Sequence, residues 1–232
     1  MPLLSGPRLA PRSGQPKQLV VFLHGYCADG NQLIGLGRQW QPLLPSAMFV
    51  APNAPDPCAD SPIARQWFPL TTRDPAERWR GVTQARPILD EFIGETLQAY
   101  GLDETRLAVV GFSQGAEMAL HVGLRRPQPP AAIIGFSGIL VGPEHLDEAV
   151  AGWQPAARPH VLLVHGDCDE VIPVKDMLAS ADRLAAAGIP CERHVSVGVG
   201  HALDESGLQR ACRFLAQCFA LPSAGPKVAR RR

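Results

Sequence analysis

The chain has 232 residues, of which 46% are hydrophobic, and its 22 basic and 22 acidic side chains give a formal net charge of zero. This length is enough for one α/β domain with a substantial buried core. A zero balance lacks the basic footprint of a nucleic-acid-binding protein, so we expect no nucleic-acid partner. The sequence has no transmembrane-like apolar stretch, and residues 1–16 carry prolines and arginines where a signal peptide would be apolar. We therefore expect a cytoplasmic protein without integral membrane contact.

Short apolar runs alternate along the chain with segments of helical periodicity. The runs predicted to form strands are 19–23, 48–51, 107–111, 132–136, 161–164 and 191–197. Apolar residues spaced as on one helix face predict helices that end near Gly101, near Gly188 and near Phe219. Continuously apolar strands are buried on both faces. With helices between them, they predict an α/β fold with a mostly parallel central sheet and helices on both faces.

The predicted domain spans residues 17–220. Residues 1–16 are expected to form an N-terminal extension or edge strands, and residues 221–232, which end in three arginines, a flexible basic tail. The stretch between the strands at 132–136 and 161–164 is too short for an inserted helical cap. We therefore expect no separate cap domain.

The pentapeptide Gly111-Phe112-Ser113-Gln114-Gly115 lies where the third of these strands gives way to a helix. Gly-x-Ser-x-Gly at this place is typical of a nucleophile elbow, whose serine sits on a strained turn that leaves no room for a flanking Cβ. The pentapeptide alone is weak evidence, because a glycine-rich turn with a helix-capping serine would have the same sequence. Its position favours Ser113 as a nucleophile.

The first strand is followed by His24-Gly25-Tyr26. An acyl-transfer enzyme stabilises its tetrahedral intermediate with two preorganised backbone N–H groups. The N–H of Gln114, directly after the serine, is one candidate, and the N–H of Tyr26 is the other. We expect His24 to brace this loop and not to take part in chemistry.

Two further strand ends carry the remaining groups of a serine hydrolase. Asp167 and Asp169 follow the strand at 161–164, and His201 follows the last strand. Serine, acid and histidine thus occur in the chain order of α/β-hydrolases, at the sheet edge where ligands bind. Residue chemistry alone does not separate Asp167 from Asp169.

Four motifs occur in order between residues 17 and 220: Leu-His-Gly, Gly-Phe-Ser-Gln-Gly, His-Gly-Asp-Cys-Asp-x-x-(Val/Ile)-Pro and Gly-His. Together they resemble the phospholipase/carboxylesterase family of α/β-hydrolases, which contains bacterial carboxylesterases and acyl-protein thioesterases. The resemblance implies an α/β-hydrolase fold. It also selects Asp169, because the family's acid precedes the x-x-(Val/Ile)-Pro segment.

By this resemblance, Ser113 is the nucleophile, Asp169 the acid and His201 the general base. The N–H groups of Tyr26 and Gln114 form the oxyanion hole. Tyr26 departs from the smaller or aliphatic residue typical of the position, but a backbone donor tolerates any side chain except proline.

The resemblance implies a serine carboxylic-ester hydrolase that works through an acyl-enzyme on short-to-medium acyl esters, and also suggests lysophospholipids or acyl-thioesters. Its substrate would be a small-molecule or lipid ester, or an acylated protein, and the protein a monomer or homodimer. No metal or other cofactor is expected. Two other classes stay open: a non-catalytic binding protein of the same fold, and an acyltransferase or peptidase on the same scaffold.

The candidate substrate-binding residues lie in two segments. They are Trp67, Phe68, Leu70, Ile139 and Leu140. Family resemblance places the first segment near the acyl or alcohol pocket. The alternative, that Trp67 and Phe68 only pin a long loop to the core, has equal weight.

The six cysteines are scattered, with no Cys-x-x-Cys pair and no Cys/His cluster at metal-ligand spacing. They are Cys27, Cys58, Cys168, Cys191, Cys212 and Cys218. We expect reduced thiols that mostly fill the core. Cys27 and Cys168 lie beside the motifs and are expected near the site, as points of oxidation and not as catalysts.

Overall fold

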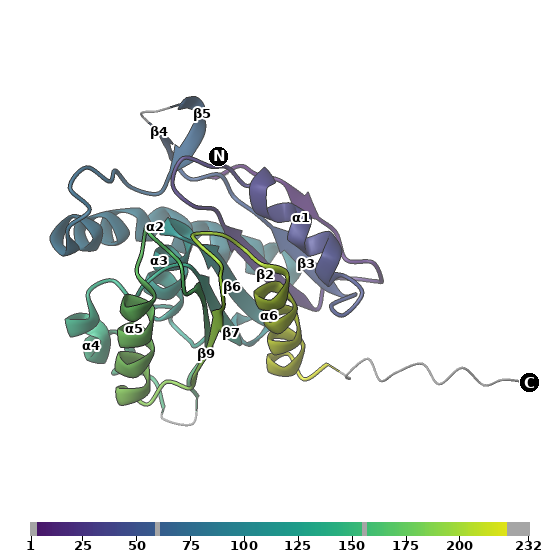
Figure 1. The fold of residues 1–232 in the computed structure, drawn as a ribbon. Helices are drawn as coiled ribbons and strands as arrows, with labels where there is room; N and C mark the ends of the chain where they lie inside the picture. The colour runs from purple at the N-terminus through teal and green to yellow at the C-terminus, as the bar shows by residue number, and fades with distance from the viewer. Residues whose placement is uncertain (1–3, 59–60, 155–156, 222–232) are drawn as a thin grey trace, which may run out of the picture.

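The central sheet determines where the functional groups lie. In this computed structural model, which describes residues 4–58, 61–154 and 157–221, seven strands form one sheet. In spatial order they are β1 (Arg8–Leu9), β3 (Ala47–Val50), β2 (Gln18–Leu23), β6 (Leu107–Phe112), β7 (Ala132–Phe136), β8 (His160–Gly166) and β9 (Cys191–Ser196). Neighbouring strands run parallel except at the edge, where β1 pairs antiparallel with β3. The predicted mostly parallel sheet is confirmed (Figure 1).

All six predicted strands are present, with ends displaced by at most two residues. The seventh strand, β1, lies within the 1–16 segment. It has only two residues, too few for a pattern that sequence could reveal. The tail predicted at 221–232 lies outside the described residues except for Leu221.

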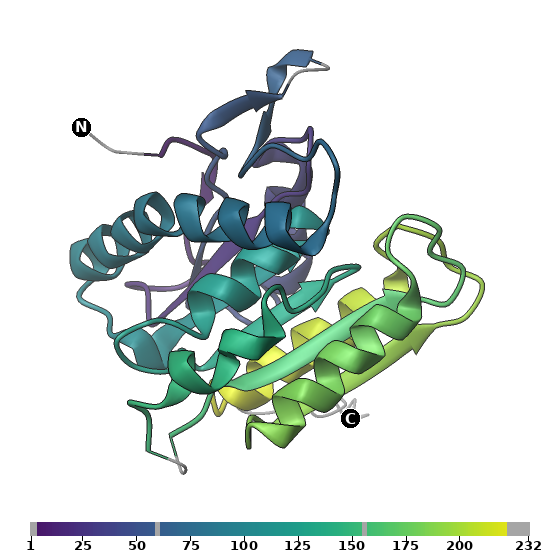
Figure 2. The same ribbon diagram turned by 90° about the vertical axis from the view of Figure 1, so that its left-hand side faces the viewer.

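Helices cover both faces of the sheet. On one face lie α1 (Asn31–Trp40), against β2 and β3, and α6 (Glu205–Cys218), against β7, β8 and β9. On the other lie α2 (Pro75–Tyr100), α3 (Gln114–Gly123) and α5 (Val174–Ala186), which Figure 2 shows in front of the sheet. The alternation of buried side chains along each strand thus builds one apolar layer per face.

Shorter elements fill the connections. A 3₁₀ turn, η1 (Glu104–Arg106), precedes β6. A second, η2 (Pro143–His145), leads into the single-turn helix α4 (Leu146–Val150) between β7 and β8. No separate cap domain is built from the described residues of this connection. None of the helices in the described ranges is long and apolar enough to cross a membrane.

Helix α2 begins at Pro75 and ends at the predicted stop. The Asp74 side chain accepts a hydrogen bond from the Glu77 N–H, and Pro75 occupies the first turn, as in a capped helix start. The helix ends at Gly101, whose φ of 64° is left-handed and favours glycine, so the predicted stop is confirmed.

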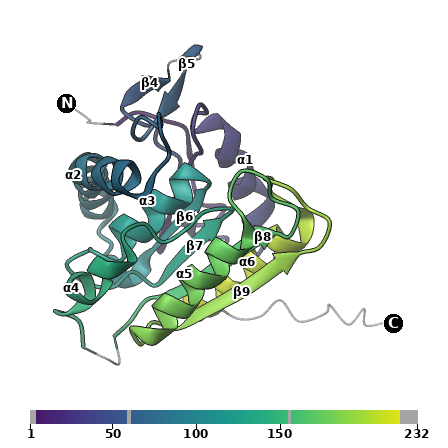
Figure 3. The same cartoon turned by 60° about the vertical axis from the view of Figure 1, so that its left-hand side comes forward.

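A two-stranded hairpin occupies part of the stretch that the sequence analysis leaves without secondary structure. It consists of β4 (Asp56–Cys58) and β5 (Ser61–Gln66) and stands off from the main sheet (Figure 3). Its short strands, each of which contains a proline, carry little strand signal. It is joined to the loop after β2 through the bridge between Ala28 and Arg65.

The register of β2 against β6 sets up the candidate site. Leu23, the last residue of β2, lies opposite Gly111. A Cβ on Gly111 would lie 2.0 Å from the carbonyl oxygen of Gly115. A Cβ on Gly115 would lie 2.0 Å from the carbonyl oxygen of Leu23. The turn after β6 therefore presses on both β2 and its own strand, and only glycine permits these contacts.

Replacing Gly111 should be costly for this reason, whereas Gly94 offers a matched control. Gly94 lies inside α2, and a Cβ added there would have no neighbouring atom within 4 Å. Gly111→Ala should lower the free energy of unfolding by about 1–3 kcal/mol or more through overpacking. Gly94→Ala should raise it by about 0.4–1 kcal/mol. Urea unfolding of both variants measures the difference. Equal effects of the two substitutions would contradict the close contact at the elbow.

Candidate active site

Ser113 lies on the turn between β6 and α3. Its backbone angles are φ 54° and ψ −121°, which are rare for a residue other than glycine. Its N–H donates to the Phe136 carbonyl at 2.8 Å, which ties the turn to the end of β7. A strained serine held between strand and helix is the geometry of a nucleophile elbow.

Three side chains distant in sequence meet at this turn. His201, on the loop between β9 and α6, places its Nε2 2.9 Å from Ser113 Oγ. Its Nδ1 lies 2.8 Å from Asp169 Oδ2, on the loop after β8. An ionised carboxylate only accepts hydrogen bonds, so Nδ1 carries the proton and Nε2 is free to accept the serine hydroxyl. This is the protonation that general-base chemistry requires.

The surroundings of Asp169 keep its carboxylate ionised and fixed. Its Oδ1 accepts from the N–H groups of Val171 and Ile172, both at 2.9 Å. Burial alone would raise the pKa of Asp169, but these bonds and the one from His201 together hold it below its ordinary value. The other carboxylate of the motif, Asp167, instead accepts from the Gly198 N–H at 2.6 Å. The structure therefore brings Asp169, and not Asp167, against the imidazole.

A second histidine, which the sequence analysis does not single out, also contacts Asp169. His165 is the penultimate residue of β8 and its side chain is fully buried. Its Nε2 lies 2.7 Å from the Ile172 carbonyl oxygen and 3.1 Å from Asp169 Oδ2. Because a carbonyl only accepts, this nitrogen carries a proton that both oxygens share. His165 thereby fixes the acid and the loop that carries it. The only sequence signal is its position at a strand end, which many structural histidines share.

Tyr26 and Gln114 lie beside Ser113 as the sequence predicts. Both line a cavity of about 200 Å³ together with Ser113 and His201. Gln114 is the first residue of α3, where backbone N–H groups have no partner inside the helix. Their role as oxyanion donors stays a prediction.

The expectation that His24 braces the loop after β2 is confirmed. Its Nε2 accepts from the Ala54 N–H at 3.0 Å and its Nδ1 donates to the Gly25 carbonyl at 2.8 Å. These partners fit a neutral ring with the proton on Nδ1. Burial lowers the pKa of His24, which keeps the ring neutral.

Trp67 and Phe68 pack into the core and do not form a substrate wall. Their exposed fractions are 1% and 2%, and neither lines a cavity at Ser113. Trp67 Nε1 donates to the His24 carbonyl at 2.9 Å, and the Phe68 ring covers the Cα of Gly81. The Gln114 side chain also bonds both backbones. The alternative interpretation, that the aromatics pin the loop, is the one that fits.

The other three candidates line cavities. Leu70 borders the small cavity at Ser113. Ile139 and Leu140 border a larger one of about 570 Å³. Arg73, Arg78, Val171 and Ile172 line both cavities, so the larger one opens beside the nucleophile. Within the described ranges, no group of three or more His, Cys, Asp or Glu side chains is arranged to hold a metal ion.

The expectation that all cysteines are reduced is wrong for one pair. Cys27 and Cys58 form a disulfide with Cα atoms 5.4 Å apart. It joins the loop of Tyr26 to the β4–β5 hairpin, two segments that only the fold brings together. The separation of 31 residues has no pattern from which sequence could predict the pair. Lasting disulfides are typical of oxidising compartments, so this pair does not support the expected cytoplasmic location.

The four other cysteines, Cys168, Cys191, Cys212 and Cys218, are free thiols. Cys168 is exposed, Cys191 and Cys218 are half-buried and Cys212 is buried, so the expectation that the cysteines mostly fill the core is wrong for these four. Burial raises the pKa of the Cys212 thiol to about 11, so it stays protonated and unreactive.

Fold and site together define the class of protein. A mostly parallel sheet with a serine elbow after β6, an acid after β8 and a histidine after β9 is the arrangement of an α/β-hydrolase. The sequence matches the phospholipase/carboxylesterase family over residues 5–219, and the chain belongs to that family of ester hydrolases. The resemblance inferred from the four motifs is confirmed.

Individual relatives agree with this assignment. Esterase YpfH of Escherichia coli (strain K12) is 27% identical over 200 residues, which cover 86% of this chain and 82% of the relative. Acyl-protein thioesterase 1 of Neurospora crassa is 26% identical over 239 residues, which cover 96% and 93%. The crystal structure of esterase PE8 aligns with a TM-score of 0.87 and 44% identity, covering 93% of this chain and 99% of that one.

The disulfide should stabilise the folded protein measurably. Closing a loop of this length is worth roughly 2–4 kcal/mol. Cys58→Ser should lower the free energy of unfolding by about that amount, and a reducing agent should do the same to the wild type. Cys168→Ser, at an exposed free thiol, is the control and should change little. Thiol titration of the denatured, unreduced protein should find the four free cysteines. Six titratable thiols would contradict the pairing.

Proposed function

We propose that this protein is a serine carboxylic-ester hydrolase in which Ser113 is the nucleophile, His201 the general base and Asp169 the acid. The observation that carries the proposal is the continuous contact from Ser113 Oγ to His201 and on to Asp169, at 2.9 Å and 2.8 Å. A serine hydroxyl is a weak nucleophile unless a base within hydrogen-bond distance removes its proton.

Acylation begins when His201 Nε2 takes the hydroxyl proton as Ser113 Oγ bonds to the acyl carbonyl carbon. The N–H groups of Tyr26 and Gln114 stabilise the resulting oxyanion, aided by the positive end of α3. The bond to the leaving alcohol or thiol then breaks, and His201 returns the proton to it. Asp169 holds the imidazole in the required tautomer and stabilises its positive charge between these steps.

Deacylation repeats the sequence with water. His201 takes a proton from water as its oxygen attacks the acyl carbon, and the bond to Ser113 Oγ breaks with return of the proton to the serine. The products are a carboxylic acid and the free enzyme. The bonds and protons of both steps balance with this chain's own residues, the ester and water.

The larger cavity supports an acyl chain of short to medium length as the preferred substrate. Its apolar lining includes Ile139, Leu140 and Val141, and its volume of about 570 Å³ is at the size of a small-ligand site. Lysophospholipids and acyl-thioesters fit the same chemistry, because only the leaving group differs. The relatives named esterase and thioesterase support this range.

Comparing the turnover of Ser113→Ala with that of Ser137→Ala tests whether Ser113 is the nucleophile, because Ser137 is a second serine nearby. Ser137 directly follows β7, close to the elbow, and is buried, with φ 48°. Ser113→Ala should lower kcat/KM for p-nitrophenyl esters at least about a thousandfold and abolish labelling by a fluorophosphonate. Ser137→Ala should keep most activity and be labelled. A non-catalytic binding protein would show neither turnover nor labelling in the wild type. An ester series of increasing chain length, with lysophospholipid and acyl-thioester substrates, defines the acyl preference.

Substituting Asp169 and Asp167 in turn tests which of the two aspartates orients His201. Asp169→Asn leaves an amide that favours the wrong tautomer of His201, and should lower kcat about 10³–10⁴-fold. Asp167→Asn removes the same charge two residues away and should change kcat by less than about threefold, because its carboxylate contacts the Gly198 N–H and the Cys168 side chain instead of the imidazole. Steady-state kinetics of the two folded variants compares them directly. Equal losses would reject the assignment of Asp169.

A further inference from the structure

A second cleft lies away from the candidate active site, between α2, α3 and the η2–α4 segment. It measures about 350 Å³ and shares no lining residue with either cavity at the nucleophile. Its lining includes two arginines and two histidines, none of which has a part in the proposed esterase mechanism. The residues are Trp79, Thr83, Arg86, His121, Arg125, His145, Glu148 and Ala149.

Arg125 has a guanidinium with donors to spare. One nitrogen donates to the His121 carbonyl at 3.2 Å, and the guanidinium lies over the Trp79 ring at 5.4 Å from its centroid. Among the described residues, no carboxylate lies within ion-pair distance of it. Burial, and then the nearby charge of Arg86, lower the pKa of Arg125 to about 10. The two cations repel each other, and an anion between them would relieve this.

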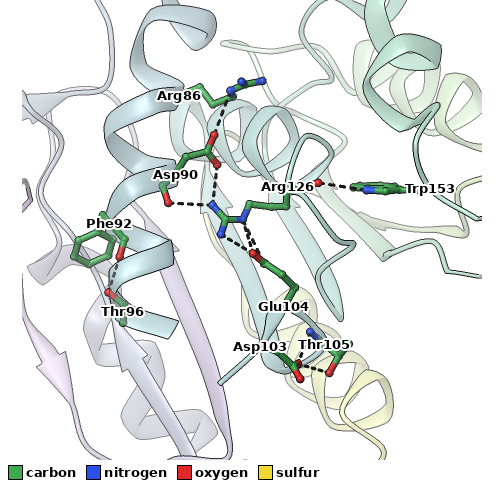
Figure 4. Close-up of polar contacts among 9 residues, drawn as sticks. All are labelled: Arg86, Asp90, Phe92, Thr96, Asp103, Glu104, Thr105, Arg126 and Trp153. Atoms are coloured by element: carbon green, nitrogen blue, oxygen red, sulfur yellow. Dashed lines mark hydrogen bonds and ion pairs between the residues drawn. The ribbon is translucent and has the colours of Figure 1, made fainter. Parts of the chain in front are cut away.

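Arg86 is held at one end only. Its Nε pairs with Asp90 Oδ2 at 3.2 Å, and its terminal nitrogens point away from that carboxylate (Figure 4). The other oxygen of Asp90 is taken by Arg126, which also binds Glu104. This neighbouring network is therefore complete by itself, and Arg86 keeps donors for another partner.

His121 supplies a polar group without a partner. The residue is 2% exposed and borders the cleft, and its Nδ1 has no hydrogen-bond partner among the described residues. Burial and the charges of Arg125 and Arg86 lower the pKa of His121 to about 3, so the ring is neutral at pH 7. A buried polar atom without a partner costs free energy, which a phosphate oxygen recovers when the imidazole ring turns this nitrogen toward the cleft.

Glu148, the acidic residue of the cleft, is not an ion-pair partner of Arg125 or a hydrogen-bond partner of His121 among the described residues. Glu148 is exposed and lies 4.0 Å from His145, which itself stacks on Trp79 with ring centroids 4.1 Å apart. The acid thus lies toward the histidine at the rim. The lining carries two guanidiniums against this one carboxylate, and of the two only Arg86 has an ion-pair partner, Asp90, outside the lining.

We propose that this cleft is a second ligand site, which binds a phosphate group through Arg86, Arg125 and His121. Guanidinium groups present forked N–H donors that match phosphate oxygens, and the neutral imidazole adds one further donor. Two cations favour a dianion over a singly charged carboxylate. The group is either free phosphate or the phosphoryl end of a small phosphomonoester.

The site lies near the C-terminal end of α3, the helix whose N-terminus directly follows the nucleophile. His121 is two turns beyond Ser113 on α3, with Glu117 between them. Glu117 is paired with Arg78, which lines both cavities of the candidate active site. A phosphate at His121 would therefore leave the nucleophile uncovered, and binding is measurable independently of esterase activity.

Calorimetric titration of the intact protein with inorganic phosphate and with glycerol 3-phosphate, at constant ionic strength, tests the site. Acetate serves as the singly charged control. We expect phosphate to bind the wild type and Ser113→Ala alike. Arg125→Gln should weaken binding at least tenfold. Arg80→Gln removes the same charge next to Trp79 but outside the cleft, and should leave binding unchanged. Tighter binding of glycerol 3-phosphate would identify the phosphomonoester as the ligand, and equal or weaker binding would identify free phosphate.

A nitrogen NMR spectrum of the wild type gives a second readout that needs no variant to fold. Phosphate should shift the side-chain nitrogen resonances of His121, and acetate should not. Absence of both heat and shift with phosphate would overturn the proposal. So would binding that survives in a folded Arg125→Gln protein, or an acetate response as strong as that of phosphate.

Discussion

The close packing of the elbow against the sheet is the constraint on which the site depends. Gly111 and Gly115 let α3 start directly on top of β2 and β6, with backbone in contact with backbone. Ser113 is then forced into its strained conformation and its hydroxyl out of the sheet. The same contact brings the loop of Tyr26 next to the first N–H of the helix. The close backbone contacts at Gly111 and Gly115 thus position both the nucleophile and the candidate oxyanion donors, through a steric effect that does not depend on polar interactions.

Behind this packing, α3 is held by buried charge. Glu117 is fully buried one turn beyond Ser113 and pairs with Arg78 of α2. Burial raises the pKa of Glu117 to about 7 although Arg78 acts in the opposite direction. Farther along, Arg126 joins α2 to the turn before β6 through Asp90 and Glu104 (Figure 4). The helix of the nucleophile is therefore fixed at both ends against the longest helix of the fold.

Sequence could predict what depends on local patterns. Continuous apolar runs predicted six strands. Because Ser113, Asp169 and His201 each follow one of these strands, the sequence also placed them together as candidate catalytic residues. What it could not predict depends on contacts between distant segments. The disulfide of Cys27, the sharing of Asp169 by His165, and the burial of Trp67 beneath the loop of His24 all arise from tertiary approach. The choice of Asp169 over its neighbour likewise needed family resemblance, because both carboxylates follow the same strand.

The disulfide has a mechanical consequence. Because Cys27 directly follows Tyr26, the disulfide makes the hairpin and the loop of Tyr26 one covalent unit. A displacement of the hairpin is therefore transmitted to the loop beside Ser113 through two sulfur atoms as well as through the backbone bridge between Ala28 and Arg65. In the reduced chain the hydrogen bonds between Ala28 and Arg65 would still couple the two segments, but no covalent cross-link would.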